Sequence, residues 1–156
     1  MKALMFISFI CAFALTIIPV DFDWRWWRPE FVLLLVIYWS MYASQYFGLV
    51  AAWCVGLIMD LLLMSPLGFH SLSVLLVSYI AHLSYRRIRN YVLWHQAIWV
   101  FVLIGLFQLF SNWIGGFFDK SVDAPLFLTA AIVSGLLWPL LVVGMGRTMV
   151  YFRLTE

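Results

Sequence analysis

Residues 91–118 read YVLWHQAIWVFVLIGLFQLFSNWIGGFF, with no acidic side chain, lysine or arginine anywhere in the run. A helix needs about 20 apolar residues to cross the roughly 30 Å hydrocarbon core of a bilayer. The run is longer than that, and its few polar side chains are uncharged or only weakly basic. It therefore predicts a membrane-spanning helix.

The composition of the whole chain agrees with this interpretation. Of the 156 residues, 66% are hydrophobic and only 10% are charged. Soluble domains have roughly 45–50% apolar and about 25% charged residues. So few charges cannot cover a water-soluble globule, and the apolar surplus must face lipid. The length leaves no room for a separate soluble catalytic domain.

Polar breaks divide the chain into six apolar segments, at residues 3–20, 31–45, 46–64, 67–85, 91–118 and 125–152. We expect an all-α membrane protein, a single integral-membrane domain over residues 1–156 built as a polytopic bundle of about six transmembrane helices. The first segment has no small-residue cleavage site after it, which favours a retained helix over a signal peptide. Segment 31–45 is short for a span, so a re-entrant or interfacial helix is the alternative there.

Two helix starts are marked by proline. Pro29 suits the first position of the second helix, and Glu30 suits its positive dipole end. Ser65 followed by Pro66 predicts an N-cap and a first-turn proline that open the fourth helix.

The basic residues predict the orientation, because they gather on the cytoplasmic side of membrane proteins. With six spans and a cytoplasmic N-terminus, the inside carries Lys2, Arg86, Arg87, Arg89, Arg147 and Arg153, and the outside carries Arg25, Arg28 and Lys120. Both termini are therefore expected in the cytoplasm. The cluster of Arg86, Arg87 and Arg89 is interpreted first as a topology signal that contacts anionic lipids, and second as a cytoplasmic docking site. The other basic residues are scattered along the chain, and a distribution of this kind does not favour nucleic-acid binding.

Asp60 is the acidic residue that lies well inside an apolar segment, where a charge is costly and usually functional. We expect it to accept hydrogen bonds from backbone amides around residues 66–70. The alternatives are a contact with a partner or ligand, and a proton relay, for which His70 is the nearest titratable side chain in sequence.

Small residues recur every fourth position before Asp60, at Ser44, Gly48, Ala52 and Gly56. Four residues turn a helix by roughly 400°, so they form one slowly drifting stripe. Small stripes let helix backbones approach closely in lipid. We interpret the stripe as an internal packing seam, and the alternative is an interface with another protein.

Two further polar faces are expected to join helices by hydrogen bonds, with a ligand cavity between them as the alternative. They consist of Ser71, Ser78 and His82 in the fourth segment and Gly105, Gln108, Asn112 and Gly116 in the fifth. Cys11 and Cys54 are expected to be small buried thiols, without a disulfide or metal.

Trp24, Trp26 and Trp27 lie with Arg25 and Arg28 after the first segment. This is the composition of an interfacial aromatic girdle, in which arginine stacks on tryptophan. The stretch is interpreted as a membrane anchor, and as a docking edge for an extracytoplasmic partner in the alternative.

Motifs of catalysis are missing from the sequence: a glycine-rich phosphate loop, a Gly-x-Ser-x-Gly elbow, a His-Glu-x-x-His helix or paired intramembrane aspartates. We therefore expect no enzyme, no cofactor and no metal site.

Taken together, the segments resemble the MreD family of rod shape-determining proteins over nearly the whole chain. The residues that carry the likeness are Arg28–Leu34 with Tyr38-Trp39, Gly48 and Gly56 before Asp60-Leu61, Leu67-Gly68, Arg89-Asn90, Leu93-Trp94, Gln96-Ala97 and Gly135–Pro139.

The resemblance implies a non-enzymatic subunit of the bacterial inner membrane, in the complex for cell elongation and control of peptidoglycan synthesis. Its direct partner would be MreC, with MreB, RodA and the transpeptidase partner of RodA in the same complex. The family is also said to look like the S components of vitamin transporters. A small-molecule-binding transporter component is therefore the alternative function, although the Ala-x-x-x-Ala coupling motif of those proteins is missing here.

Overall fold

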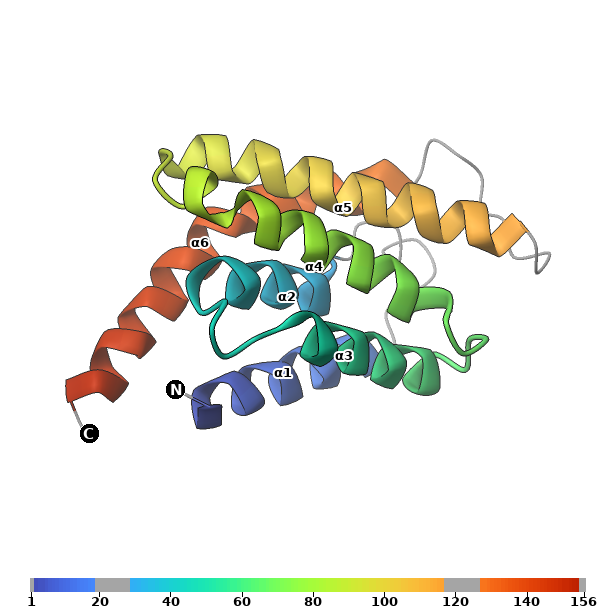
Figure 1. Cartoon of the computed structure of the whole chain (residues 1–156), viewed down its shortest axis with the longest axis horizontal. Coiled ribbons are helices and arrows are strands. Elements are labelled where there is room, and N and C mark those ends of the chain that lie inside the picture. The colour runs from blue at the N-terminus through green and yellow to red at the C-terminus, as the bar shows by residue number, and fades with distance from the viewer. Residues whose placement is uncertain (1, 19–28, 117–126, 155–156) are drawn as a thin grey trace.

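The computed structural model describes residues 2–18, 29–116 and 127–154. Six helices make up these ranges: α1 (Lys2–Ile17), α2 (Phe31–Tyr42), α3 (Leu49–Leu62), α4 (Phe69–Ile88), α5 (Leu93–Gly116) and α6 (Phe127–Leu154). Figure 1 shows them arranged as a bundle with roughly aligned long axes. The expectation of an all-helical chain is confirmed, with one helix for each apolar segment.

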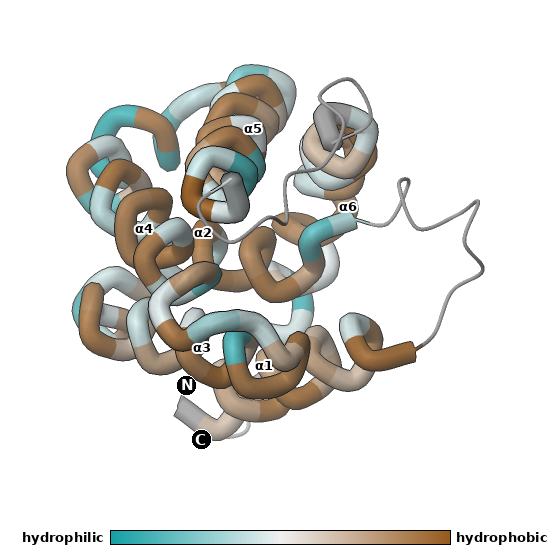
Figure 2. Tube along the Cα trace, turned by 90° about the vertical axis from the view of Figure 1, so that its right-hand side faces the viewer, coloured by the Kyte–Doolittle hydropathy of each residue, from teal (hydrophilic) through white to brown (hydrophobic). Residues whose placement is uncertain are grey.

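The short helix α2 is the core of the bundle. Its residues 32–41 are all buried, and it contacts α1, α4, α5 and α6; Figure 2, turned by 90° from the first view, shows it among the other helices. A helix that is apolar on every side is a buried helix. An interfacial helix keeps one side open to solvent, and α2 has no such side.

Each neighbour of α2 is also joined to it by a hydrogen bond. Trp39 Nε1 donates to Ser8 Oγ of α1 at 3.1 Å, and the hydroxyls of Ser40 and Ser78 of α4 lie 3.1 Å apart. Tyr42 Oη donates to Gln96 Oε1 of α5 at 3.2 Å, and the backbone N of Glu30, the N-cap of α2, donates to Ser134 Oγ of α6 at 3.0 Å. One bond is at the N-cap of α2 and three are in its last turn, so they fix the two ends of the helix against four neighbours.

The outer surface of the bundle is apolar. Large hydrophobic side chains are exposed on every helix other than α2, for example Ile10 of α1, Val50 of α3, Leu83 of α4, Ile98 of α5 and Leu140 of α6. Soluble monomers rarely expose such an extended apolar surface. The free cysteines Cys11 and Cys54 are exposed on the same surface. The prediction that they are buried is wrong, because the helix faces that carry them point outward.

Two helices in the described part of the chain are long and apolar enough to cross a bilayer: α5 and the stretch Thr129–Thr148 of α6. The apolar helices α1, α2 and α3 are shorter; at 1.5 Å per residue α2 measures only about 18 Å. The expected count of six spans therefore stays a prediction.

The two ends of the bundle carry different elements. The beginning of α1, the end of α6 and the α4–α5 connection lie together on the left of Figure 1, and the α3–α4 connection lies at the opposite end. We call the first the terminal end and the second the distal end. In the same view the second half of α6, which follows Pro139 near the middle of the helix, leads away from α5, and proline is a common cause of such bends.

The two proline signals are displaced from the helix starts that they were expected to mark. Helix α2 begins at Phe31 after Glu30 as N-cap, so Pro29 lies outside it. Helix α4 begins at Phe69, after Gly68 at φ 103°. Ser65 and Pro66 thus belong to the preceding turn, and Ser65 is not the N-cap. A glycine suits position 68 because side chains disfavour positive φ.

The contact between α3 and α4 depends on Gly56. A Cβ at this position would collide with the Cα of Ser71 and lie 3.0 Å from the Cβ of Ser71. Since the colliding atom belongs to the backbone, α4 itself would have to move. The small residue at position 56 thus sets how closely the two helices approach.

We expect Gly56→Ala to destabilise the protein by about 1–3 kcal/mol, because overpacking a close helix contact forces backbone shifts. The matched control is Gly105→Ala in α5, where a Cβ meets nothing within 4 Å. There the same change should be neutral or stabilising, since alanine favours a helix over glycine. Thermal unfolding in mild detergent measures both. Equal melting temperatures of the two variants would contradict the close approach.

Candidate functional site

Asp60 lies near the end of α3 and is completely buried. Its Oδ1 accepts hydrogen bonds from Ser65 Oγ at 2.9 Å and from the backbone N of His70 at 2.7 Å. Its Oδ2 accepts from the backbone N of Gly68 at 3.0 Å and of Ser71 at 3.3 Å. The carboxylate is thereby bound to the turn and to the first residues of α4.

This carboxylate caps helix α4 from a different helix. The first N–H groups of any helix have no partner within it, and a negative charge there is favoured by the helix dipole. Gly68, the N-cap residue, has no side chain to accept from them, and Asp60 supplies the acceptor instead. The prediction that Asp60 accepts from backbone amides around residues 66–70 is confirmed.

The imidazole of His70 completes the site. Its Nδ1 lies 3.0 Å from Asp60 Oδ1 and 3.1 Å from Ser65 Oγ. Because a carboxylate only accepts hydrogen bonds, Nδ1 carries the proton in the contact with Asp60. Both oxygens of Asp60 are thus occupied by donors of the protein, which leaves them poorly suited to act as a base or to bind a ligand.

We expect Asp60→Leu to destabilise the protein strongly, since each buried donor left unpaired costs about 1–3 kcal/mol. Ser65→Ala is the control, because it removes one hydroxyl and leaves the backbone bonds to Asp60 in place. Membrane accumulation and the melting temperature in detergent report the difference. If Asp60→Leu behaves like Ser65→Ala, the cap is not needed for the fold.

The stripe of small residues is placed only in part where it was expected. Ala52, Gly56 and Asp60 are buried on α3, and α3 packs on α4. Ser44 and Gly48 precede the helix, and Gly48 is exposed with nothing near the position of a Cβ. The four-residue spacing therefore extends beyond the start of α3, and only its part within the helix forms a buried stripe.

The polar faces of α4 and α5 are used for contacts between helices. Ser78 pairs with Ser40 of α2, as expected of an interhelical bond. The bond between α4 and α5 runs from Ser111 Oγ to Ser73 Oγ at 2.9 Å, and neither residue was expected in it. Buried atoms without a partner in the described part of the chain include Ser71 Oγ, His82 Nε2 and Gln108 Oε1. Of the other residues of the α5 face, Gly105 is buried, Gly116 is exposed, and Asn112 interacts with another residue.

Gln96 is a central polar residue that the sequence reasoning did not single out as a site. Its Oε1 accepts from Tyr42 of α2 and from Trp138 Nε1 of α6, each at 3.2 Å. Its Nε2 donates to the carbonyls of Arg89 and Tyr91, at 3.3 and 3.0 Å. One amide therefore joins three helices and the α4–α5 connection. The sequence feature that could have indicated this role is a glutamine near the start of a long apolar helix, where a polar side chain needs hydrogen-bond partners.

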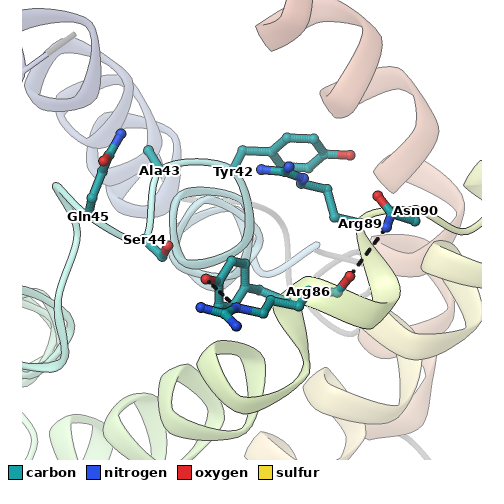
Figure 3. Close-up of a pocket in the computed structure, with 8 residues that line it drawn as sticks. Tyr42, Ala43, Ser44, Gln45, Arg86, Arg89 and Asn90 are labelled. Carbon is teal, nitrogen blue, oxygen red and sulfur yellow. Dashed lines mark hydrogen bonds between the residues drawn. The ribbon is translucent and has the colours of Figure 1, made fainter.

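The arginine cluster lies at the terminal end, and part of it lines a pocket (Figure 3). The cavity measures about 430 Å³ and is lined by Tyr42, Ala43, Ser44, Gln45, Tyr85, Arg86, Arg89 and Asn90. Arg86 donates from Nε to Tyr85 Oη at 3.0 Å, and its Cζ lies 5.7 Å from the centre of the Tyr85 ring. Arg87 is exposed and does not line the pocket. Arg86 and Arg89 thus share a pocket to which Arg87 does not contribute.

Other predicted sites receive no structural description. Trp24, Arg25, Trp26, Trp27 and Arg28 lie outside the described residues, so the aromatic girdle stays a prediction. Among residues 2–18, 29–116 and 127–154, no three histidine, cysteine or acidic side chains gather in a way that could hold a metal ion.

The fold and the contacts of Asp60 and Gln96 define a small helical membrane protein whose polar side chains hold its helices together. The sequence profile of rod shape-determining protein MreD matches residues 1–145. The chain therefore belongs to the MreD family, as the resemblance predicted. This is a family of membrane proteins that determine cell shape, and it is not a known family of enzymes.

A curated relative supports the assignment. Rod shape-determining protein MreD of Haemophilus influenzae is 28% identical over 135 residues, which cover 84% of this chain and 81% of that protein. No solved structure matches the chain significantly. The likeness to the S components of transporters therefore stays a prediction.

Proposed function

We propose that the protein is a non-enzymatic scaffold subunit of the rod-shape complex in the bacterial inner membrane. It would bind MreC directly and, with MreB, RodA and the transpeptidase partner of RodA in the same complex, help to control peptidoglycan synthesis. Besides family membership, the observation that carries the proposal is the hydrogen bonding of Asp60. Its carboxylate is saturated by the turn and by α4, which fits a structural role and leaves little capacity for catalysis.

In this proposal the helices span the membrane with both termini in the cytoplasm. The beginning of α1, the end of α6 and the α4–α5 connection lie at one end of the bundle (Figure 1). Arg86, Arg87 and Arg89 are found at that connection. Basic residues prefer the cytoplasmic side, which supports a cytoplasmic terminal end.

The docking surface for a partner helix is proposed between α5 and α6. The stripe on α3 is occupied by α4 and cannot serve there. An open apolar groove of about 320 Å³ is lined by Trp94, Ala97, Ile98, Phe101, Ile132, Gly135 and Leu136. Its small residues Ala97 and Gly135 are buried where α6 packs against α5, and its exposed side chains Ile98 and Leu136 are free to contact a partner helix. A single-span partner such as MreC has the chemistry to fill it.

Disruption of the gene tests the function. We expect rounded cells, and we expect rod shape to return when the gene is supplied again. Microscopy of the strain and measurement of growth on minimal medium distinguish the alternatives. Rod-shaped cells with an uptake defect would contradict the proposal and support a transporter component.

Photo-crosslinking tests the docking surface. A photoreactive residue in place of Ile98 or Leu136, both 64% exposed in the groove, should capture MreC in membranes. The matched controls are Ile7 and Ile10 of α1, which are 52% and 66% exposed outside the groove. Capture from α1 with none from the groove would place the partner elsewhere.

A further inference from the structure

The pocket at the terminal end is built from two parts of the chain that are distant in sequence. One wall is the end of α2 with the connection to α3, at residues 42–45, and the other is the end of α4 with residues 85–90. In Figure 3 the side chains of Arg86 and Arg89 both extend toward the first wall, and the guanidinium of Arg89 overlaps the Tyr42 ring in this view. Two guanidinium groups therefore face one cavity.

No carboxylate neutralises these two arginines within the described residues. The acidic side chains in those ranges are Glu30 and Asp60. Glu30 lies at the beginning of α2, about 18 Å from the end that forms the pocket, and Asp60 caps α4 at its other end. Within the part of the chain that the structure describes, the positive charge of the pocket is therefore not balanced by a carboxylate.

A purely structural role explains only part of this arrangement. Arg86 and Arg87 lie in the last turn of α4, where a cation is favoured by the helix dipole. The side chain of Asn90 also serves this helix end, because its Nδ2 donates to the backbone carbonyl of Arg86 at 3.5 Å. Neither interaction needs a cavity, and neither involves Ser44 of the opposite wall. The combination of a cavity, two guanidinium groups and neutral hydrogen-bonding groups requires a further explanation.

We infer that this pocket binds a phosphate group through Arg86 and Arg89. The planar guanidinium matches a phosphate with paired hydrogen bonds, and the hydroxyl of Ser44 on the opposite wall is a further polar group of the pocket. The phosphate belongs either to the headgroup of an anionic lipid or to a soluble phosphate compound. The inference does not depend on the proposed scaffold function.

The surroundings favour the headgroup as the source. The pocket lies at the ends of helices whose outer faces are apolar, which is the level of lipid headgroups in a bilayer. Exposed apolar side chains adjoin it in the chain, with Tyr46 directly after residues 42–45 and Leu83 one turn before Arg86. These are suitable neighbours for acyl chains.

The experiment compares two double variants of the full-length protein with the same change of charge. Arg86→Gln with Arg89→Gln removes both guanidinium groups from the pocket, and Arg87→Gln with Arg147→Gln removes two exposed ones outside it. Native mass spectrometry measures binding of phosphatidylglycerol against phosphatidylcholine, and calorimetry measures binding of inorganic phosphate. Melting temperatures in phosphatidylcholine alone verify that both variants fold.

We expect the pocket variant to bind phosphatidylglycerol about tenfold more weakly, because charge-assisted hydrogen bonds are lost, and the control variant to bind within about twofold of the parent protein. Selective loss of phosphatidylglycerol identifies a lipid headgroup. Selective loss of inorganic phosphate binding identifies a soluble ligand. Equal losses in both double variants, or no selective binding by the parent protein, would overturn the inference. If the pocket variant does not fold, the single variants Arg86→Lys and Arg89→Lys replace it, and unchanged affinity in both would count equally against the inference.

Discussion

The pairing of backbone N–H groups at the beginning of α4 is the constraint on which the distal end depends. Asp60 is fully buried, so water does not reach the N–H groups that face it, and these groups need an acceptor from the chain. The Asp60 carboxylate is this acceptor for Gly68, His70 and Ser71. The same contact ties the end of α3 to α4 and holds Gly56 against Ser71, so that capping and close packing support each other.

A second set of polar contacts holds the centre. Helix α2 has apolar side chains on every face and therefore no preferred side to bury. Its orientation is determined by specific hydrogen bonds. Ser40, Tyr42 and the backbone of Glu30 supply some of these. Gln96 extends them to Trp138 and to the α4–α5 connection. Polar residues in this bundle thus specify which helices meet, and the apolar majority supplies the packed volume.

Much of this could be predicted from residue patterns because lipid imposes simple rules. Long uncharged runs predicted the helices, and the isolated charge of Asp60 predicted its backbone partners. The exact helix starts could not be predicted, since Ser65 and Pro66 suit a tight turn as well as an N-cap. The role of Gln96 in joining helices was not predicted, because a single amide in an apolar run has no periodic pattern and its partners Tyr42 and Trp138 lie far away in sequence. The exposure of Cys11 and Cys54 required knowledge of which helix faces point outward.

The position of α2 at the centre bears on how the protein is assembled during synthesis. The chain emerges from its N-terminus, so α2 is made before α4, α5 and α6, which later cover it. Until Trp138 of α6 is in place, the ring of Tyr38 lacks the neighbour that lies 6.3 Å away in the finished bundle. Helix α6 therefore closes the cover of α2, and a ribosome that stalls before it would release a product with an open core, which is a natural substrate for membrane quality control.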